Sequence, residues 1–183
     1  MRLLRCEDLE LHEFFDDEIP RYAILSHTWD RGQEVSFQDL QLVNKSKAEH
    51  GFPDVAFGHI TSRSGYDKIV RCAKLARSHR LEWLWTDTCC IDKTSSAELS
   101  EAINSMGRWY HNSDICYAYL NDVAHLKTDK IKLPEKQFDS SRWFTQGWTL
   151  QELLAPNYLL FNDRHWSYVG HESINDGKAR SVT

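Results

Sequence analysis

The chain has 183 residues, 41% hydrophobic and 27% charged, which is the composition of one globular domain rather than of a disordered or fibrous protein. The net charge of −5 (22 basic minus 27 acidic residues) arises in residues 1–20, which hold seven acidic side chains and two arginines (2 − 7 = −5). The remainder is neutral, which argues against nucleic-acid binding, because phosphate contacts need a basic surplus.

The lengths of the apolar runs and the spacing of the cysteines predict the cellular compartment of the protein. No run approaches 18 residues, so no membrane span is expected, and the start of the chain has no apolar run long enough for a signal peptide. The five cysteines are an odd number without the spacing of a disulfide framework. They predict reduced thiols and a cytoplasmic protein.

The first predicted elements are a strand and a helix. Residues 22–25 are a short apolar run that gives way to polar residues at Ser26, which is typical of a buried strand with polar side chains at its carboxyl end. A short helix is predicted near 36–43. Residues 65–80 have helical spacing, with Lys68, Arg71, Lys74 and Arg77 expected away from a buried face formed by Ile69, Cys72, Ala73 and Ala76.

The next elements continue the alternation. A strand over 81–85 ends at Thr86, Asp87 and Thr88. Ser95 and Glu98 have the spacing of a capping box. They open a helix to residue 110 that is predicted to pack through Leu99, Ala102, Ile103, Met106 and Trp109.

A third strand over 115–120 ends at Asn121 and Asp122, and a fourth covers 158–161. Between them, a short helix is predicted from Thr149 to the residue before Pro156.

Alternating strands and helices predict an α/β fold with a parallel sheet covered by helices on both faces. Ligands bind such sheets at the carboxyl ends of the strands, where the polar clusters lie. The domain organisation predicted is an acidic N-terminal segment at 1–20, a domain at 21–170 and a frayed tail at 171–183.

Four motifs resemble the fungal heterokaryon incompatibility (HET) domain: YAILSHTW at 22–29, WTDTCCIDK at 85–93, EAINSMGRWY at 101–110 and SRWFTQGWTLQELLAP at 141–156. The resemblance covers about residues 21–166 and implies an effector of vegetative incompatibility and programmed cell death. HET domains are also distantly similar to TIR domains. That similarity implies a three-layer, flavodoxin-like (TIR-like) fold with a mostly parallel central sheet and helices on both faces. The family usually has R-G-W where this chain has Gln146-Gly147-Trp148.

The TIR similarity implies a catalytic glutamate. Some TIR domains hydrolyse NAD with a glutamate in a W-C-x-x-E-L segment, and residues 148–153 match it with Thr149 in place of cysteine. Glu152 would then stabilise positive charge on the ribose of NAD or a related nucleotide, which is a substrate; no cofactor is expected. The structural alternative is a capping-box glutamate bonded to the start of its own helix.

Other side chains are candidates for substrate binding. Trp29 could stack on a base or nicotinamide ring, Ser26 and Thr28 could bind ribose or phosphate oxygens, and His27 could also act as a general base. Asp87 could bond a ribose, and Trp148 completes the set. These residues also have structural alternatives. Trp29 could lie at the edge of the core or of the domain, His27 could be a strand-end histidine with its hydrogen bonds satisfied, and Asp87 could form an Asx turn. Trp148, with Trp143, could hold the short helix against the sheet.

Three functions remain open from the sequence. The first is an effector that hydrolyses a nucleotide through Glu152. The second is a non-enzymatic TIR-like module that acts by self-association or through protein partners. The third is a hydrolase that uses Cys89 or Cys90 with Asp87 and His27. Adjacent cysteines do not have zinc-site spacing, so no metal is expected, and packing at a strand end is their simpler role.

Overall fold

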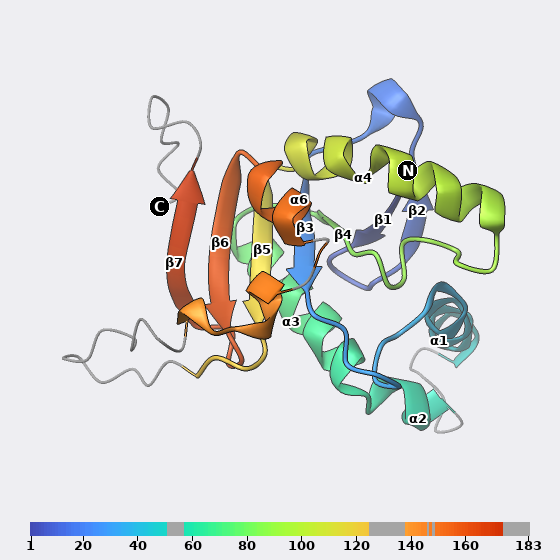
Figure 1. Ribbon diagram of the computed structural model, residues 1–183. Helices are drawn as coiled ribbons and strands as arrows, with labels where there is room; N and C mark the ends of the chain where they lie inside the picture. Colours follow the sequence, from blue (N-terminus) through green and yellow to red (C-terminus); the bar gives the residue numbers. More distant parts are fainter. Residues whose placement is uncertain (51–56, 125–137, 146, 148, 174–183) are drawn as a thin grey trace. The chain divides into compact units, whose positions relative to one another are not determined.

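The computed structural model describes residues 1–50, 57–124, 138–145, 147 and 149–173 (Figure 1). The protein is α/β with mixed strand pairing, and it divides into two compact units. Unit 1 comprises Met1–Ala23 and Trp29–Met106, and unit 2 comprises Ile24–Thr28 and Gly107–Thr183. Strand β3 (Tyr22–His27) and helix α4 (Ser96–Asn112) each begin in unit 1 and end in unit 2.

Unit 1 holds three antiparallel strands in the order β2-β1-β4. These are β1 (Arg2–Arg5), β2 (Leu11–Glu13) and β4 (Trp83–Trp85). The helices are η1 (Asp16–Glu18), α1 (Phe37–His50), α2 (Gly58–Thr61) and α3 (Ser64–Ser78). Helix α3 packs against β4 and is buried through the predicted residues Ile69, Cys72, Ala73 and Ala76.

In unit 1, one predicted side-chain position is wrong and strand β1 was not predicted. Lys68 was expected on an outer face of α3 but is only 4% exposed, because its ammonium forms an ion pair of 2.7 Å with Glu34. The acidic segment 1–20 also contributes core, since Leu3 and Leu4 of β1 are fully buried. Two apolar residues are too short a run to predict a strand from periodicity.

Unit 2 carries strands in the order β3-β5-β6-β7. The strands are β5 (Ile115–Leu120), β6 (Tyr158–Asp163) and β7 (Tyr168–Ser173). Strands β5 and β6 are parallel, as predicted, whereas β6 and β7 are antiparallel. The sequence predicted no strand at β7, which includes 171–173 of the expected tail; residues 174–183 lie outside the described residues.

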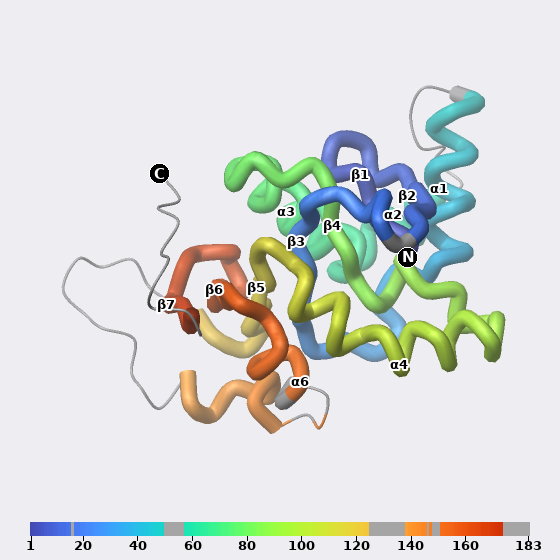
Figure 2. Tube along the Cα trace, turned by 90° about the horizontal axis from the view of Figure 1, so that it is seen from above, coloured from blue at the N-terminus to red at the C-terminus, as the bar shows by residue number. Residues whose placement is uncertain are grey.

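Two short helices follow β5 in unit 2: η3 (Arg142–Thr145) and α6 (Thr149–Leu154). They contact each other, η3 also contacts β5, and both lie on one face of the strands (Figures 1 and 2). The predicted short helix is therefore confirmed. It brings Glu152 to the polar end of β3 described below.

Helix α4 is confirmed, but its predicted face is partly wrong. Ile103 is 43% exposed, and Leu99, Met106 and Trp109 are only half-buried. Ala102 is buried as predicted, and the other buried positions of the helix are Ser105 and Tyr110. An error of one position turns a helical face by about 100°, because the helix has about 3.6 residues per turn. A hydrophobic pattern does not identify the buried face well, because small and polar residues such as Ala102 and Ser105 occupy buried positions.

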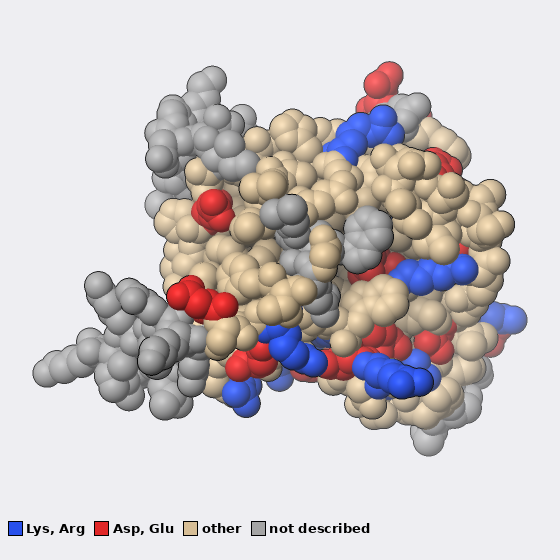
Figure 3. Space-filling view, viewed as in Figure 1, with Lys and Arg blue, Asp and Glu red and all other residues tan. Residues whose placement is uncertain are grey.

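The distribution of charged side chains on the surface agrees with the lack of a basic surplus in the sequence. On the face shown in Figure 3, basic and acidic side chains of the described residues lie next to one another rather than forming one basic surface. Among the helices within the described ranges, none has the length and apolarity needed to cross a lipid bilayer.

Candidate functional site

The predicted site residues fall into two groups, one in each unit. The Glu152 group consists of Ser26, Trp143 and Glu152 and belongs to unit 2. The Trp29 group consists of Trp29, Asp87 and Lys93 and belongs to unit 1. The expectation that Glu152 and Trp29 line one cleft therefore stays a prediction.

Ser26 is the centre of the Glu152 group. Its hydroxyl donates a hydrogen bond to a carboxylate oxygen of Glu152 and accepts one of 2.7 Å from the indole Nε1–H of Trp143. Ser26 and Trp143 are both fully buried, whereas Glu152 is half-buried. Buried Ser26, itself bonded by buried Trp143, thus holds one oxygen of a carboxylate that keeps contact with solvent.

The local sequence explains this arrangement. Ser26 lies near the polar end of β3, and Trp143 lies in η3, which packs against β5. Glu152 is in the first turn of α6. Its bond to Ser26 is a contact that a purely capping role does not require. The Thr149 side chain and Trp148 lie outside what the structure describes, so the capping alternative and the roles predicted for Trp148 stay untested.

A second set of contacts lies at the ends of β3 and β5. The Thr28 hydroxyl donates to Asn121 Oδ1 at 3.3 Å, and the Arg142 guanidinium donates to the same oxygen at 3.1 Å. Asp122 accepts from the Arg142 backbone N–H and from the Ser141 hydroxyl, each at 2.7 Å. Burial opposes ionisation of Asp122, but these hydrogen bonds outweigh it and leave its pKa below the ordinary value.

His27 is a buried side chain at the end of β3. Its Nδ1 lies 3.2 Å from the Thr28 carbonyl oxygen. Since a carbonyl only accepts, we assign the proton to Nδ1, which leaves the basic lone pair on Nε2. That atom is shielded from solvent. A general base must reach its proton donor directly or through one water, so the predicted role of His27 as a base or in substrate binding stays a prediction.

The Trp29 group presents an aromatic ring held from two sides. The Trp29 indole N–H donates to Asp87 at 3.0 Å, and the Lys93 ammonium lies 3.6 Å from the ring centroid. Lys93 and Asp87 also form an ion pair of 3.7 Å. Burial lowers the pKa of Lys93, and the charge of Asp87 opposes that shift. Trp29 remains 51% exposed, as a stacking surface requires.

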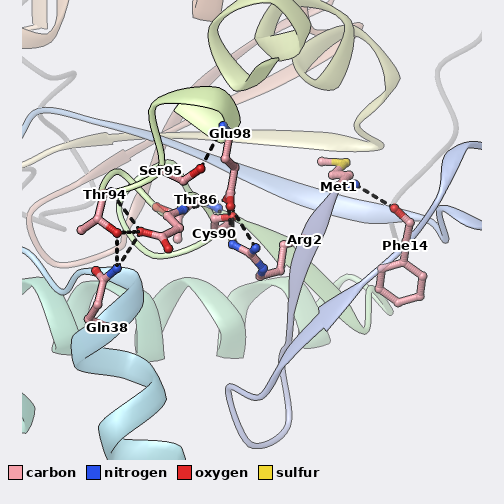
Figure 4. Close-up of polar contacts among 10 residues, drawn as sticks. Met1, Arg2, Phe14, Gln38, Thr86, Cys90, Thr94, Ser95 and Glu98 are labelled. Carbon is pink, nitrogen blue, oxygen red and sulfur yellow. Dashed lines mark hydrogen bonds and ion pairs between the residues drawn. The ribbon is translucent and has the colours of Figure 1, made fainter. Parts of the chain in front are cut away.

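The loop that carries Asp87 and Lys93 is fixed by three elements of unit 1 (Figure 4). From β1, Arg2 donates to the Cys90 carbonyl oxygen at 3.2 Å and to Glu98 at 2.8 Å. From α1, Gln38 donates to Asp92 at 2.6 Å. From α4, Glu98 accepts from the Asp92 backbone N–H at 2.7 Å.

The predicted capping box at Ser95 is half-formed. The Glu98 backbone N–H donates to the Ser95 hydroxyl at 3.3 Å, whereas the Glu98 carboxylate binds Asp92 and Arg2 instead of the helix cap.

The burial of the cysteines argues against the cysteine-hydrolase alternative. All five are buried free thiols, which confirms the prediction that none is in a disulfide. Burial raises the pKa of Cys89, the opposite of what an activated thiolate nucleophile needs. Within the described part of the chain, no three His, Cys, Asp or Glu side chains are grouped to hold a metal ion.

Sequence reasoning missed several residues at these sites. Lys93 is the last residue of a quoted motif, but nothing in its spacing shows that it lies over Trp29. Arg142 precedes Trp143, which was expected only to pin a helix. The long-range partners Arg2 and Gln38 have no local sequence signal. Their roles follow from the tertiary fold.

Comparison with known proteins identifies the family. The profile of the family described as heterokaryon incompatibility protein (HET) matches residues 22–137. The chain is 41% identical over 190 aligned positions to the vegetative incompatibility protein HET-E-1 of Podospora anserina, in an alignment that covers 100% of this chain and 13% of that protein. No solved structure matches the chain. The chain therefore belongs to the heterokaryon incompatibility (HET) family.

Proposed function

We propose that this chain is an effector of vegetative incompatibility that cleaves NAD or a related nucleotide, with Glu152 as the catalytic carboxylate. The observation that carries the proposal is the hydrogen bond between Ser26 and Glu152, which fixes a half-buried carboxylate at the polar end of β3. The similarity of residues 148–153 to the catalytic segment of TIR domains supports the same assignment.

The chemistry that suits this carboxylate is cleavage of the bond between nicotinamide and ribose. The bonding electrons leave with the pyridinium nitrogen, so nicotinamide departs as a neutral molecule and positive charge builds on the ribose. Water adds to the ribose carbon and releases a proton. A carboxylate about 4 Å from that charge stabilises it by about 4 kcal/mol at an effective dielectric of about 20. Partial exposure of Glu152 reduces this figure.

The surrounding residues have positioning roles. In this proposal the hydroxyl of Ser26 holds one carboxylate oxygen of Glu152, and the carboxylate binds a ribose hydroxyl of the substrate. Trp143 fixes Ser26 in turn, because a buried hydroxyl that accepts from the indole directs its own proton toward Glu152. Such preorganisation lowers the reorganisation needed when charge develops.

Expression in fungal hyphae tests this proposal. The wild type should kill cells and deplete NAD, and Glu152→Gln, which keeps the size but removes the charge, should do neither. The matched control is Glu172→Gln, which removes an exposed carboxylate of β7 and should act like the wild type. A folded Glu152→Gln variant that still kills the cells rules out the enzymatic function.

The exposure of Leu154 favours a second candidate function. Leu154 is 61% exposed on α6, two residues after Glu152, and an apolar side chain in that position suits contact with a protein partner or a second copy. In a non-enzymatic signalling module, Leu154→Lys would abolish toxicity and Glu152→Gln would not. The reverse result favours nucleotide cleavage.

A further inference from the structure

We propose that the outer edge of β2, together with helix α1, binds an extended basic segment of a partner protein, which adds to the sheet as a further strand. The residues of this site all belong to unit 1, and none of them is assigned to nucleotide cleavage. The evidence is the direction of the backbone groups of β2, a cavity beside this strand, and the charge of the surrounding residues.

The pairing with β1 determines which backbone groups of β2 point outward. The Arg5 N–H donates to the Glu10 carbonyl oxygen at 2.8 Å, and the Phe14 N–H donates to the residue before β1, also at 2.8 Å. In an antiparallel pair, positions bonded to the partner strand alternate with positions that face away from it. The bonded positions are 10, 12 and 14, so the N–H and C=O groups of Leu11 and Glu13 point away from β1.

The outward edge of β2 has no neighbouring strand among the described residues. Strand β2 is at the end of the order β2-β1-β4, and it is the outermost strand of unit 1 in Figure 1. Leu11 and Glu13 are two positions apart, a separation of about 7 Å in an extended chain, which is the repeat of a neighbouring strand. Their backbone groups are therefore arranged to bond an added strand.

A cavity of about 700 Å³ lies between β2 and α1. This volume is typical of pockets that hold a ligand. The residues that line it include Leu11 and His12 of β2 and Gln41 and Leu42 of α1. Leu42 is 47% exposed and Leu11 is half-buried, so both can contact an apolar side chain of the added segment. Space for a further chain thus lies beside the backbone groups that would bind it.

The charges around this cavity favour a basic segment. Residues 2–13, which form β1, β2 and their turn, carry two arginines and four acidic side chains, a balance of 2 − 4 = −2. Helix α1 is neutral, with two lysines, Asp39 and Glu49 (2 − 2 = 0). Glu13 is exposed on β2 itself. Pairing β2 with the same strand of a second copy would bring like charges together, whereas lysine or arginine side chains of a partner would attract them.

Calorimetry at low ionic strength with a synthetic hexapeptide of alternating lysine and valine tests this inference. Leu11 and Glu13 lie on one face of β2 and Glu10 and His12 on the other, so the lysines share a face with an acidic residue in either orientation. Methylation of every backbone amide nitrogen of the peptide keeps its charge but removes its donors, and should weaken binding about tenfold or more. Glu13→Lys should weaken binding of the unmethylated peptide about threefold or more. The matched control is Glu172→Lys, an equal change of charge at an exposed position of β7, and it should bind like the wild type.

Amide hydrogen exchange locates the contact. Saturating peptide should slow the exchange of the Leu11 and Glu13 amides about tenfold or more, and should leave that of His12, whose N–H faces β1, nearly unchanged. Absence of binding, binding without this slowing, or equal binding of the methylated peptide overturns the inference. Slow exchange of Leu11 and Glu13 without peptide, together with dimers in sedimentation, would place a second copy at this edge and overturn it as well. These outcomes do not depend on whether nicotinamide is released.

Discussion

Ser26→Ala tests the hydrogen-bonded core of the proposed site. The substitution removes one oxygen from a fully buried position and changes little volume. It takes the acceptor from the Trp143 indole N–H, which is itself fully buried and bonded at 2.7 Å. An orphaned buried donor costs about 1–3 kcal/mol, whereas the half-buried Glu152 can regain bonds to water.

We therefore expect Ser26→Ala to lower the free energy of unfolding by about 2 kcal/mol, or the melting temperature by roughly 4–8 °C for a chain of this size. Urea denaturation followed by far-UV circular dichroism measures the change. Ser113→Ala is the control, because this buried hydroxyl of unit 2 bonds only a carbonyl three residues away, at 2.8 Å. It should cost less.

A double-mutant cycle isolates the bond itself. In the Ser26→Ala background, Trp143→Phe no longer breaks a hydrogen bond, so its cost should be smaller than in the wild type by about 1 kcal/mol or more. The reasoning is refuted if the two costs add, or if Ser26→Ala changes stability by less than about 0.5 kcal/mol, since Ser26 would then not satisfy the indole.

Three further outcomes follow from the geometry. Lys68→Met should lower the free energy of unfolding, measured by urea denaturation, by about 3–5 kcal/mol, because it leaves the Glu34 carboxylate without its buried cation. A loss of less than about 1 kcal/mol would contradict the ion pair. Burial opposes the ionisation of Asp39, but hydrogen bonds from Ser36 and the charge of Arg63 outweigh it and lower its pKa. The stability that ionised Asp39 contributes is present above the unfolded pKa of about 3.9 and is lost as pH falls through the lower folded pKa. Asp39→Asn should therefore flatten the fall in the free energy of unfolding below about pH 4. Parallel curves of stability against pH for the variant and the wild type would exclude the effect. Iodoacetamide at pH 8 should leave the native protein unmodified and label all five thiols after unfolding, since burial raises the pKa of Cys6 to about 12, and native labelling would contradict the packing.

Short-range patterns in the sequence predicted much of the fold. The apolar run of β3, the helical spacing of α3 and the run of β5 each lie within one element, and the structure contains all three. Strands β1, β2 and β7 were missed because none of them has a clear alternation of apolar and polar residues. The antiparallel pairing of these strands makes the strand pairing mixed.

For the candidate site, too, the sequence predicted some residues and missed others. Polar residues at a strand end pointed to Ser26, the resemblance of residues 148–153 to TIR domains pointed to Glu152, and the structure bonds the two together. The hydrogen bond from Trp143 to Ser26, the bond from Arg142 to Asn121 and the position of Lys93 over Trp29 could not be predicted, because they depend on the packing of loops. Lys68 shows the general limit, since only the tertiary fold reveals that a lysine is buried beside a carboxylate.

Release of nicotinamide from NAD by the purified, concentrated protein tests the central claim most directly. Chromatographic detection should show product increasing with time in the wild type and in Glu172→Gln. In Glu152→Gln the rate should fall by at least about tenfold, equivalent to about 1.4 kcal/mol of barrier, while circular dichroism shows an unchanged fold. Equal release by folded wild type and Glu152→Gln, or no release by either, contradicts catalysis by Glu152.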